Sequence, residues 1–227
     1  MQIGCPNGPA LFVGYFFGAA GLRLSRTDHG RRQIVPLDRP AYTPGYDAVP
    51  ANMTVSIPDQ ALLSTHTASG ETLASLAARG PLLLVFLRHF GCPLCQEMVA
   101  DVAARRASLT ASSTTVVFVH MHPEPQAATF FARYGVSDLQ RVSDADRTLY
   151  QAFGVARARP TSWLSVGSLR HYLSAMWHGH LPKLVGGDVG QMSGVIRIVD
   201  GRIDRDVRDT GFDTRPDFDD LLACPLP

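Results

Sequence analysis

The chain has 227 residues, of which 45% are hydrophobic and 18% are charged, and its 21 basic and 20 acidic residues leave a formal net charge of +1. This composition is typical of an ordinary globular protein, and the balanced charge, without a basic run, argues against nucleic acid as a partner. Four cysteines, two of them close together, do not form the disulfide framework of a small secreted protein. We therefore expect a cytoplasmic protein.

The N-terminal part of the chain is expected to lie outside the folded domain. Residues 1–22 carry no charge. Their apolar run, Pro9–Leu22, is short for a membrane span and lacks the preceding positive charge of a secretory signal. Five prolines within residues 36–58 predict a linker with no helix or interior strand. We expect an extension or linker over residues 1–52, disordered or loosely packed, and a folded domain over 53–227. A weak membrane anchor at the apolar run is the less favoured alternative.

The stretch Pro81–Leu109 predicts a strand, a turn and a helix, after a short helix that begins near Leu73. Six consecutive apolar residues, Leu82–Leu87, are typical of a strand that is buried on both faces. From Pro93 onward apolar residues recur at helical spacing, and proline suits the first helical position because its missing N–H costs nothing there. The turn ends in the sequence CPLC (residues 92–95), which puts a Cys-x-x-Cys pair on the first turn of the helix.

This placement of two cysteines predicts redox chemistry. Unpaired backbone N–H groups and the helix dipole favour a thiolate at a helix N-terminus, so the pKa of a cysteine there falls below its free value of about 8.5. We expect Cys92, at the N-cap, to be the more exposed and more acidic thiol. Burial beside apolar residues should raise the pKa of Cys95. Half of a zinc site and two packed core thiols are the alternatives, although Cys5 and Cys224 stand alone and complete no zinc site.

A second buried strand is expected at Thr114–Val119, which is rich in β-branched residues. Because the carboxyl ends of parallel strands form one edge of a sheet, His120 should lie at the same end as the cysteines, with the backbone of Met192–Gly194 opposite them. His120 and His122 are expected to point to opposite sides. One loop histidine near the site is therefore favoured over a metal-binding pair.

The rest of the chain alternates between further helices and strands. Two regions are predicted only coarsely: one or two helices within residues 160–185, followed by a glycine-rich loop at 186–190. The remaining elements are expected to be a helix at Pro125–Tyr134, a short strand at Val142–Ser143, a helix at Arg147–Phe153 capped by Asp144, a hairpin of Gly194–Val199 with Arg202–Val207, and a closing helix at Phe212–Leu222. This order predicts an α/β fold, with a mixed central sheet flanked by helices and an antiparallel hairpin at its edge.

Two segments resemble a known family. The run FLRHFGCPLCQEMVADVAARR resembles the peroxiredoxin-like branch of the AhpC/TSA family, and GGDVGQMSGVIRIVDGRI resembles that branch's Gly-Gly-Asp…Gln segment and last hairpin. The resemblance covers residues 55–224 and implies a thioredoxin-like fold. It also implies an antioxidant, thiol-dependent oxidoreductase that needs no cofactor or metal. Its Cys-x-x-Cys pair would reduce a peroxide, disulfide or similar oxidised substrate, and a thiol reductant would be its second partner.

The chain departs from the ordinary peroxiredoxin motif Pro-x-x-x-Thr-x-x-Cys. Counting back from Cys92 places His89 and Val85 at the threonine and proline positions, and counting back from Cys95 places Cys92 and Arg88 there. The second count preserves the spacing with a cysteine in place of threonine, which favours Cys95 as the attacking thiol. The position at the helix N-cap favours Cys92, and we adopt Cys92 as the attacking group and Cys95 as the resolving group.

The candidate catalytic residues are Cys92, Cys95, Arg88 and His89. Arg88 would supply positive charge to the thiolate or, alternatively, form a salt bridge at the strand end. His89 would donate a proton or serve only as a packed turn residue. The alternative function is that of a non-catalytic binding module, such as a copper or zinc carrier that uses both cysteines and a loop histidine, since thiolates suit Cu(I).

Overall fold

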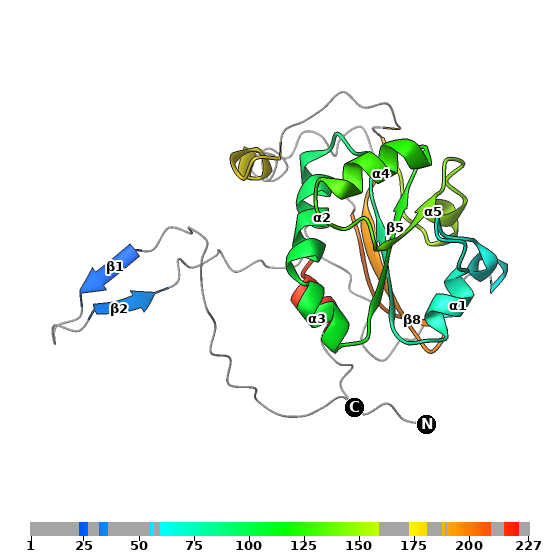
Figure 1. Cartoon of the computed structure of the whole chain (residues 1–227), viewed down its shortest axis with the longest axis horizontal. Helices are drawn as coiled ribbons and strands as arrows, with labels where there is room; N and C mark the ends of the chain where they lie inside the picture. The colour runs from blue at the N-terminus through cyan, green and yellow to red at the C-terminus, as the bar shows by residue number, and fades with distance from the viewer. Residues whose placement is uncertain are drawn as a thin grey trace. The chain divides into compact units, whose positions relative to one another are not determined.

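The structure is a computed structural model (Figure 1), and the chain divides into two compact units, residues 1–47 and 48–227. The structure describes residues 23–26, 32–35, 55–56, 60–158, 173–180, 188, 190–209 and 216–222. In the first unit, strands β1 (Arg23–Arg26) and β2 (Arg32–Val35) pair antiparallel, a hairpin that the composition did not predict. The apolar run Pro9–Leu22, considered above as an anchor, lies outside the described residues.

The second unit contains a six-stranded mixed sheet in the order β3-β8-β7-β4-β5-β6. Its strands are β3 (Val55–Ser56), β4 (Leu82–Phe86), β5 (Thr115–His120), β6 (Gln140–Ser143), β7 (Gly194–Val199) and β8 (Arg202–Arg208). Strands β4, β5 and β6 are parallel, whereas β7 is antiparallel to both β4 and β8. The mixed sheet and its hairpin are as predicted, but the hairpin is not at the edge, because β3 pairs with β8 on its outer side.

The described helices agree with the predicted order, with two differences in length. They are α1 (Leu73–Ala77), α2 (Pro93–Ala104), α3 (Arg106–Ala111), α4 (Glu124–Ala132), α5 (Thr148–Ala152) and α7 (Phe218–Leu222), with a 3-10 helix at Gln60–Ser64 and a helical turn at 173–177. The helix expected after Pro93 is divided at Arg105, whose ψ of 17° leaves the helical range. The closing helix begins at Phe218, because Pro216 and Asp217 are not helical, and the earlier part of its predicted range, residues 212–215, lies outside the described residues. No helix in the described parts of the chain is both long enough and apolar enough to cross a bilayer.

Separate hydrophobic clusters cover the two faces of the sheet. Because successive side chains of a strand point to opposite faces, Leu83 and Val85 of β4 join a cluster with residues of α2 and α4, whereas Leu84 and Phe86 join residues of α1 and α5. Figure 1 shows α2 and α3 on one side of the sheet and α1 and α5 on the other. The run of apolar residues in β4 is thus explained by burial on both faces.

The last residues of β4 and β5 and the first residue of β7 lie at the same end of the sheet. Phe86, the last residue of β4, pairs with Gly194, the first residue of β7. The hydroxyl group of Tyr150 in α5 lies within hydrogen-bond distance of the carbonyl oxygens of Leu87 (2.6 Å) and Val119 (2.9 Å). The buried Tyr150 therefore fixes the ends of the two central parallel strands relative to each other, and the turn after β4 begins from this fixed point.

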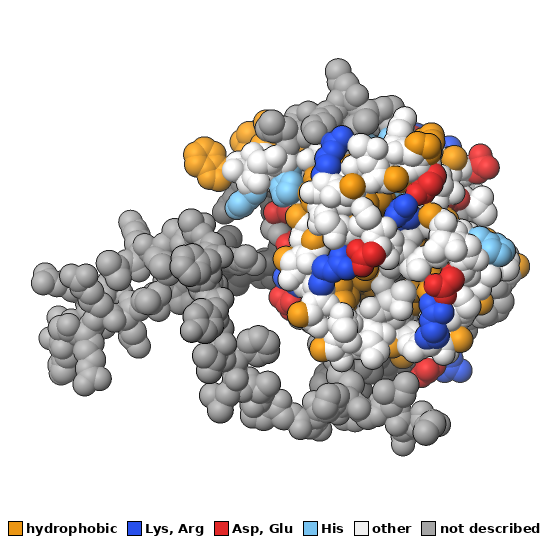
Figure 2. Space-filling view, in the orientation of Figure 1, with side chains coloured by type: hydrophobic (Ala, Val, Ile, Leu, Met, Phe, Trp, Pro, Cys, Tyr) orange, Lys and Arg blue, Asp and Glu red, His pale blue; other side chains and the backbone are white. Residues whose placement is uncertain are grey.

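Ion pairs are distributed over the surface of the second unit. Figure 2 shows basic and acidic side chains interspersed on the visible face, without a patch of one sign. Arg106 pairs with Asp138, and Arg141 pairs with Glu124. The described residues on this visible face therefore lack the clustered positive charge that binds a phosphate backbone.

Candidate active site

The Cys-x-x-Cys pair lies at the start of helix α2, at the end of the sheet where β4 and β5 finish. Cys92 is the N-cap residue, with φ −77° and ψ 120°, and Pro93 is the first helical residue. The backbone N–H of Cys92 donates to the carbonyl oxygen of His89 (3.1 Å), and the carbonyl oxygen of Cys92 accepts from Gln96 N–H (3.0 Å). A tight turn and the first helical hydrogen bond thus fix the backbone of Cys92 from both sides. The predicted strand, turn and helix are confirmed.

Both cysteines are buried free thiols, so Cys92 is hardly more exposed than Cys95, although we had expected it to be the more exposed of the two. The exposed fraction is 1% for Cys92 and 0% for Cys95, and both belong to the hydrophobic cluster that also contains Phe90 and Met98. The exposure was overestimated because the turn before the helix packs Phe90 into the core instead of leaving the N-cap open. Access to Cys92 from solvent is therefore narrow.

The two thiols differ in acidity despite their equal burial. A hydrogen bond from the Cys95 thiol, the charge of Arg88 and the backbone N–H groups of Cys95 and Leu94 lower the pKa of Cys92 to about 6, against the opposing effect of burial. Burial raises the pKa of Cys95, and its interactions with Cys92 raise it further. The sulfur of Cys95 accepts a hydrogen bond from the backbone N–H of Arg88 (3.2 Å). At neutral pH Cys92 is mainly a thiolate and Cys95 a thiol.

Arg88 lies beside the cysteines and forms a buried ion pair. Its Nη2 atom is 2.9 Å from Oδ2 of Asp209, and each side chain is only 1% exposed. Burial lowers the pKa of Arg88, but the charges of Asp209, Cys92 and Cys95 outweigh this effect, so that the guanidinium remains a cation. The salt bridge expected at the strand end is therefore present, whereas a catalytic part for Arg88 remains a prediction. Asp209 was not predicted.

His89 and His120 are neutral histidines at the same end of the sheet. Burial, followed by the charges of Arg88 and His122, lowers the pKa of His89. Burial lowers the pKa of His120 to about 4, against the opposing charge of Glu124. The imidazolium form of His89 is therefore scarce at neutral pH, and its carbonyl oxygen is an acceptor in the cysteine turn. This arrangement fits the turn-residue interpretation of His89 better than that of an acid.

His120 and His122 lie on the same side, against Phe90, and not on opposite sides as we had expected. The ring centroids of both lie close to that of Phe90, at 5.3 Å for His120 and 4.2 Å for His122. The prediction was wrong because only successive residues of a strand point to opposite faces, whereas residues two apart, such as His120 and His122, share a face. In the described parts of the chain, no group of three or more potential ligands among His, Cys, Asp and Glu is close enough to hold a metal.

His122 and Gln96 hold the turn in front of the cysteines, a role that the sequence did not indicate. The backbone N–H of Phe90 donates to Nε2 of His122 (3.3 Å), whose Nδ1 lies 3.3 Å from Oε1 of Gln126. The side-chain amide of Gln96 donates to the carbonyl oxygen of Phe90 (3.2 Å), and the Phe90 ring stacks on Phe130 with 4.1 Å between centroids. Both backbone polar groups of Phe90 and its ring are therefore fixed.

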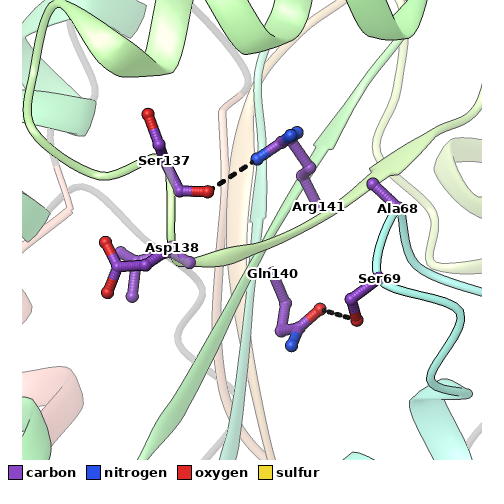
Figure 3. A pocket seen from close by; sticks show the side chains of 7 residues that line it. Ala68, Ser69, Ser137, Asp138, Gln140 and Arg141 are labelled. Atoms are coloured by element: carbon purple, nitrogen blue, oxygen red, sulfur yellow. Dashed lines mark hydrogen bonds between the residues drawn. The ribbon is translucent and has the colours of Figure 1, made fainter.

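A cavity of about 140 Å³ lies elsewhere, beside strand β6 (Figure 3), and is lined by Ala68, Ser69, Ser137, Asp138, Leu139, Gln140 and Arg141. Its polar side chains are already engaged, since Ser69 donates to Gln140 and Arg141 donates to the carbonyl oxygen of Ser137. Ligand pockets usually enclose about 300–1,000 Å³. The cavity is smaller than that, and the cysteine pair remains the better candidate site.

The mixed sheet, with a Cys-x-x-Cys pair at the start of the helix after its central strand, defines a thioredoxin-like protein. Residues 54–174 match the AhpC/TSA family. Because this match spans more than half of the chain, the protein belongs to the AhpC/TSA family, as the resemblance of its motifs implied.

Solved structures with the same fold include two from Xanthomonas campestris. The match to the bacterioferritin comigratory protein has 17% sequence identity and a TM-score of 0.50, and it covers 71% of this chain and 87% of that protein's chain. A cysteine-to-serine mutant of peroxiredoxin Q is 18% identical, with 72% and 88% coverage and a TM-score of 0.51. The dsbF protein of Mycobacterium tuberculosis is 21% identical, with 74% and 95% coverage and a TM-score of 0.45. No curated protein sequence matches. The first two likenesses confirm the predicted fold class.

Proposed function

We propose that this protein is a thiol-dependent oxidoreductase in which Cys92 attacks an oxidised substrate and Cys95 resolves the product as an intramolecular disulfide. The observation that carries this proposal is the unequal acidity of the pair. Cys92, at the N-cap of α2, has its pKa lowered to about 6 beside the Cys95 thiol and Arg88. A reactive cysteine needs a thiolate at working pH, and a resolving cysteine needs to retain its proton until the first step is complete.

The proposed reaction transfers two electrons from the dithiol. With a peroxide, the Cys92 thiolate attacks one oxygen, the O–O bond breaks, and the second oxygen leaves as an alkoxide or hydroxide that takes up a proton. Cys92 is then a sulfenic acid. The Cys95 sulfur attacks it, and water leaves with the Cys95 proton as the disulfide forms. Two external thiols reduce this disulfide and are themselves oxidised to a disulfide. With a disulfide substrate, Cys92 forms a mixed disulfide and displaces one substrate thiolate. Cys95 then attacks the Cys92 sulfur, and the second substrate thiol leaves with the Cys95 proton as the same intramolecular disulfide forms.

The burial of the pair restricts the substrate class. With Cys92 only 1% exposed, a disulfide on a folded protein would reach its sulfur only if the turn before Cys92 opened. Small peroxides and small disulfides need much less space. We therefore place small oxidised molecules ahead of protein substrates.

A turnover screen of the full-length protein tests this function. Peroxides, low-molecular-weight disulfides and endoperoxides are supplied with a dithiol reductant, and substrate loss is measured for the wild type, Cys92→Ser and Cys95→Ser. We expect turnover by the wild type and none by Cys92→Ser. Cys95→Ser, assayed without the reductant, should consume one equivalent of substrate and stop at the sulfenic acid or mixed disulfide. Undiminished turnover by Cys92→Ser would refute the assigned roles. Failure with every substrate, together with stoichiometric copper or zinc after purification, would point to a metal-binding module instead.

A further inference from the structure

Three strand ends meet near the turn that precedes Cys92. Arg88 lies two residues beyond β4, Ser193 immediately precedes β7, and Asp209 immediately follows β8. The register of the sheet brings these positions together, since Gly194 of β7 pairs both with the last residue of β4 and with the last residue of β8. The ladder of β7 and β8 continues one step further through the Asp209 N–H, which donates to the Ser193 carbonyl oxygen (3.0 Å).

The side chain of Asp209 is held between Ser193 and Arg88. Its Oδ2 atom accepts a hydrogen bond from the hydroxyl group of Ser193 and another from Nη2 of Arg88 at 2.9 Å. The three residues are 1–2% exposed. A carboxylate with this degree of burial interacts strongly with the adjacent guanidinium, because water screens neither charge. The carboxylate at the end of β8 thus contacts the guanidinium of Arg88 directly.

We propose that Asp209, held by Ser193, is a positioning residue that fixes the Arg88 guanidinium beside the Cys92–Cys95 turn and offsets part of its charge. This inference rests on the proposed function in taking Cys92 as the attacking thiolate. It assigns to the end of β8, more than 100 residues from the cysteines along the chain, a part in setting their reactivity.

The two effects of Asp209 on the pKa of Cys92 oppose each other. Holding the guanidinium beside the thiolate lowers this pKa, whereas offsetting the charge of the guanidinium raises it. In Asp209→Asn the amide oxygen still accepts from Arg88, but the negative charge is gone, so the cation stabilises the thiolate more strongly. In Asp209→Ala the acceptor is lost as well, and the guanidinium is free to move away from the thiolate. Since an opposite charge within about 4–6 Å shifts a pKa by roughly 1–3 units, the two variants should shift the pKa of Cys92 measurably and in opposite directions.

The test measures the pKa of Cys92 in the full-length protein from the pH dependence of its alkylation by iodoacetamide, followed by mass spectrometry of the peptide that contains Cys92. A Cys95→Ser background retains a hydroxyl donor to Cys92 and removes the second titrating thiol. Relative to this background, we expect Asp209→Asn to lower the pKa of Cys92 by about one unit and Asp209→Ala to raise it by about one unit. If Asp209→Ala does not fold, Asp209→Ser replaces it, because its short side chain cannot reach the guanidinium either.

Asp204→Asn is the matched control. Asp204 is also a carboxylate of β8 that pairs with a mostly buried arginine, at 3.3 Å from Arg197, but Arg197 lies opposite Leu83 near the start of β4, at the far end of the sheet. The control should leave the pKa of Cys92 unchanged. Unchanged values in both Asp209 variants, or shifts in the same direction, would overturn the inference. A Cys92 pKa of ordinary value in the background protein would instead count against the proposed function itself.

Discussion

His120 illustrates at the scale of a single residue how burial links protonation to stability. The side chain is fully buried, and burial lowers its pKa to about 4, whereas a histidine in the unfolded chain has a pKa of about 6.5. The folded protein therefore binds fewer protons than the unfolded chain between these two pH values. The contribution of the neutral ring to stability is complete above pH 6.5 and is lost as the pH falls towards 4.

A measurement of the free energy of unfolding against pH tests this reasoning. The difference between the two pKa values corresponds to a loss of about 3 kcal/mol between about pH 6.5 and about pH 4. His120→Leu, with a side chain of similar volume that does not titrate, should lose about 3 kcal/mol less than the wild type over this range, as measured by urea denaturation. His66→Leu, at an exposed position, is the control and should follow the wild type. Equal losses in wild type and His120→Leu would contradict the account.

Asp209 and His122 show which residues of the site could not be predicted. Nothing in the run of charged residues of β8 distinguishes Asp209 from its neighbours, because its importance depends on the strand register that brings it to Arg88. His122 was noted in the sequence, but its contact with Phe90 depends on where β5 ends. Cys92, in contrast, was predictable because a local pattern of strand, turn and helix places it.

At the scale of elements, the spacing of apolar residues and the positions of glycine and proline were sufficient to predict most of the fold. Leu82–Leu87 and Thr114–Val119 were recognisable as strands because strands buried on both faces consist of apolar residues throughout. The division of the predicted helix at Arg105 was missed, because apolar spacing continues across it. The edge strand β3 was missed because two residues of pairing leave no periodic pattern.

Helix α2 depends on the turn before it, and Gln96 connects the two. Gln96→Met preserves the length of the side chain but removes the hydrogen bond to the buried carbonyl oxygen of Phe90. Leaving a buried carbonyl group without this donor costs about 1–3 kcal/mol, and we expect a loss of that size in urea denaturation, together with faster alkylation of Cys92. Gln151→Met, on the exposed side of α5, is the control. An unchanged unfolding midpoint in Gln96→Met would show that the turn is held by other contacts.

At the scale of the whole molecule, the division between extension and domain remains a prediction. Strand β3, at Val55–Ser56, pairs with β8, and the expected domain boundary at Met53 keeps it. A truncated protein that begins at Met53 should therefore remain soluble and melt cooperatively within a few degrees of the full-length protein. A truncation to Gln60, which lacks β3, should melt at a lower temperature because it exposes the edge of β8. A non-cooperative melt or insolubility of the longer truncation would mean that residues 1–52 belong to the core.

The assignment of the attacking thiol is tested most directly by trapping the sulfenic acid. The Cys95→Ser and Cys92→Ser variants are each treated with a limiting amount of peroxide and a sulfenate-specific reagent, and labelling of the remaining cysteine is followed over time. Because Cys92 is the thiolate at neutral pH and Cys95 the thiol, Cys95→Ser should be labelled rapidly at Cys92, and Cys92→Ser slowly or not at all at Cys95. Equal or reversed labelling rates would contradict the account, because the start of α2 and Arg88 would then not activate Cys92.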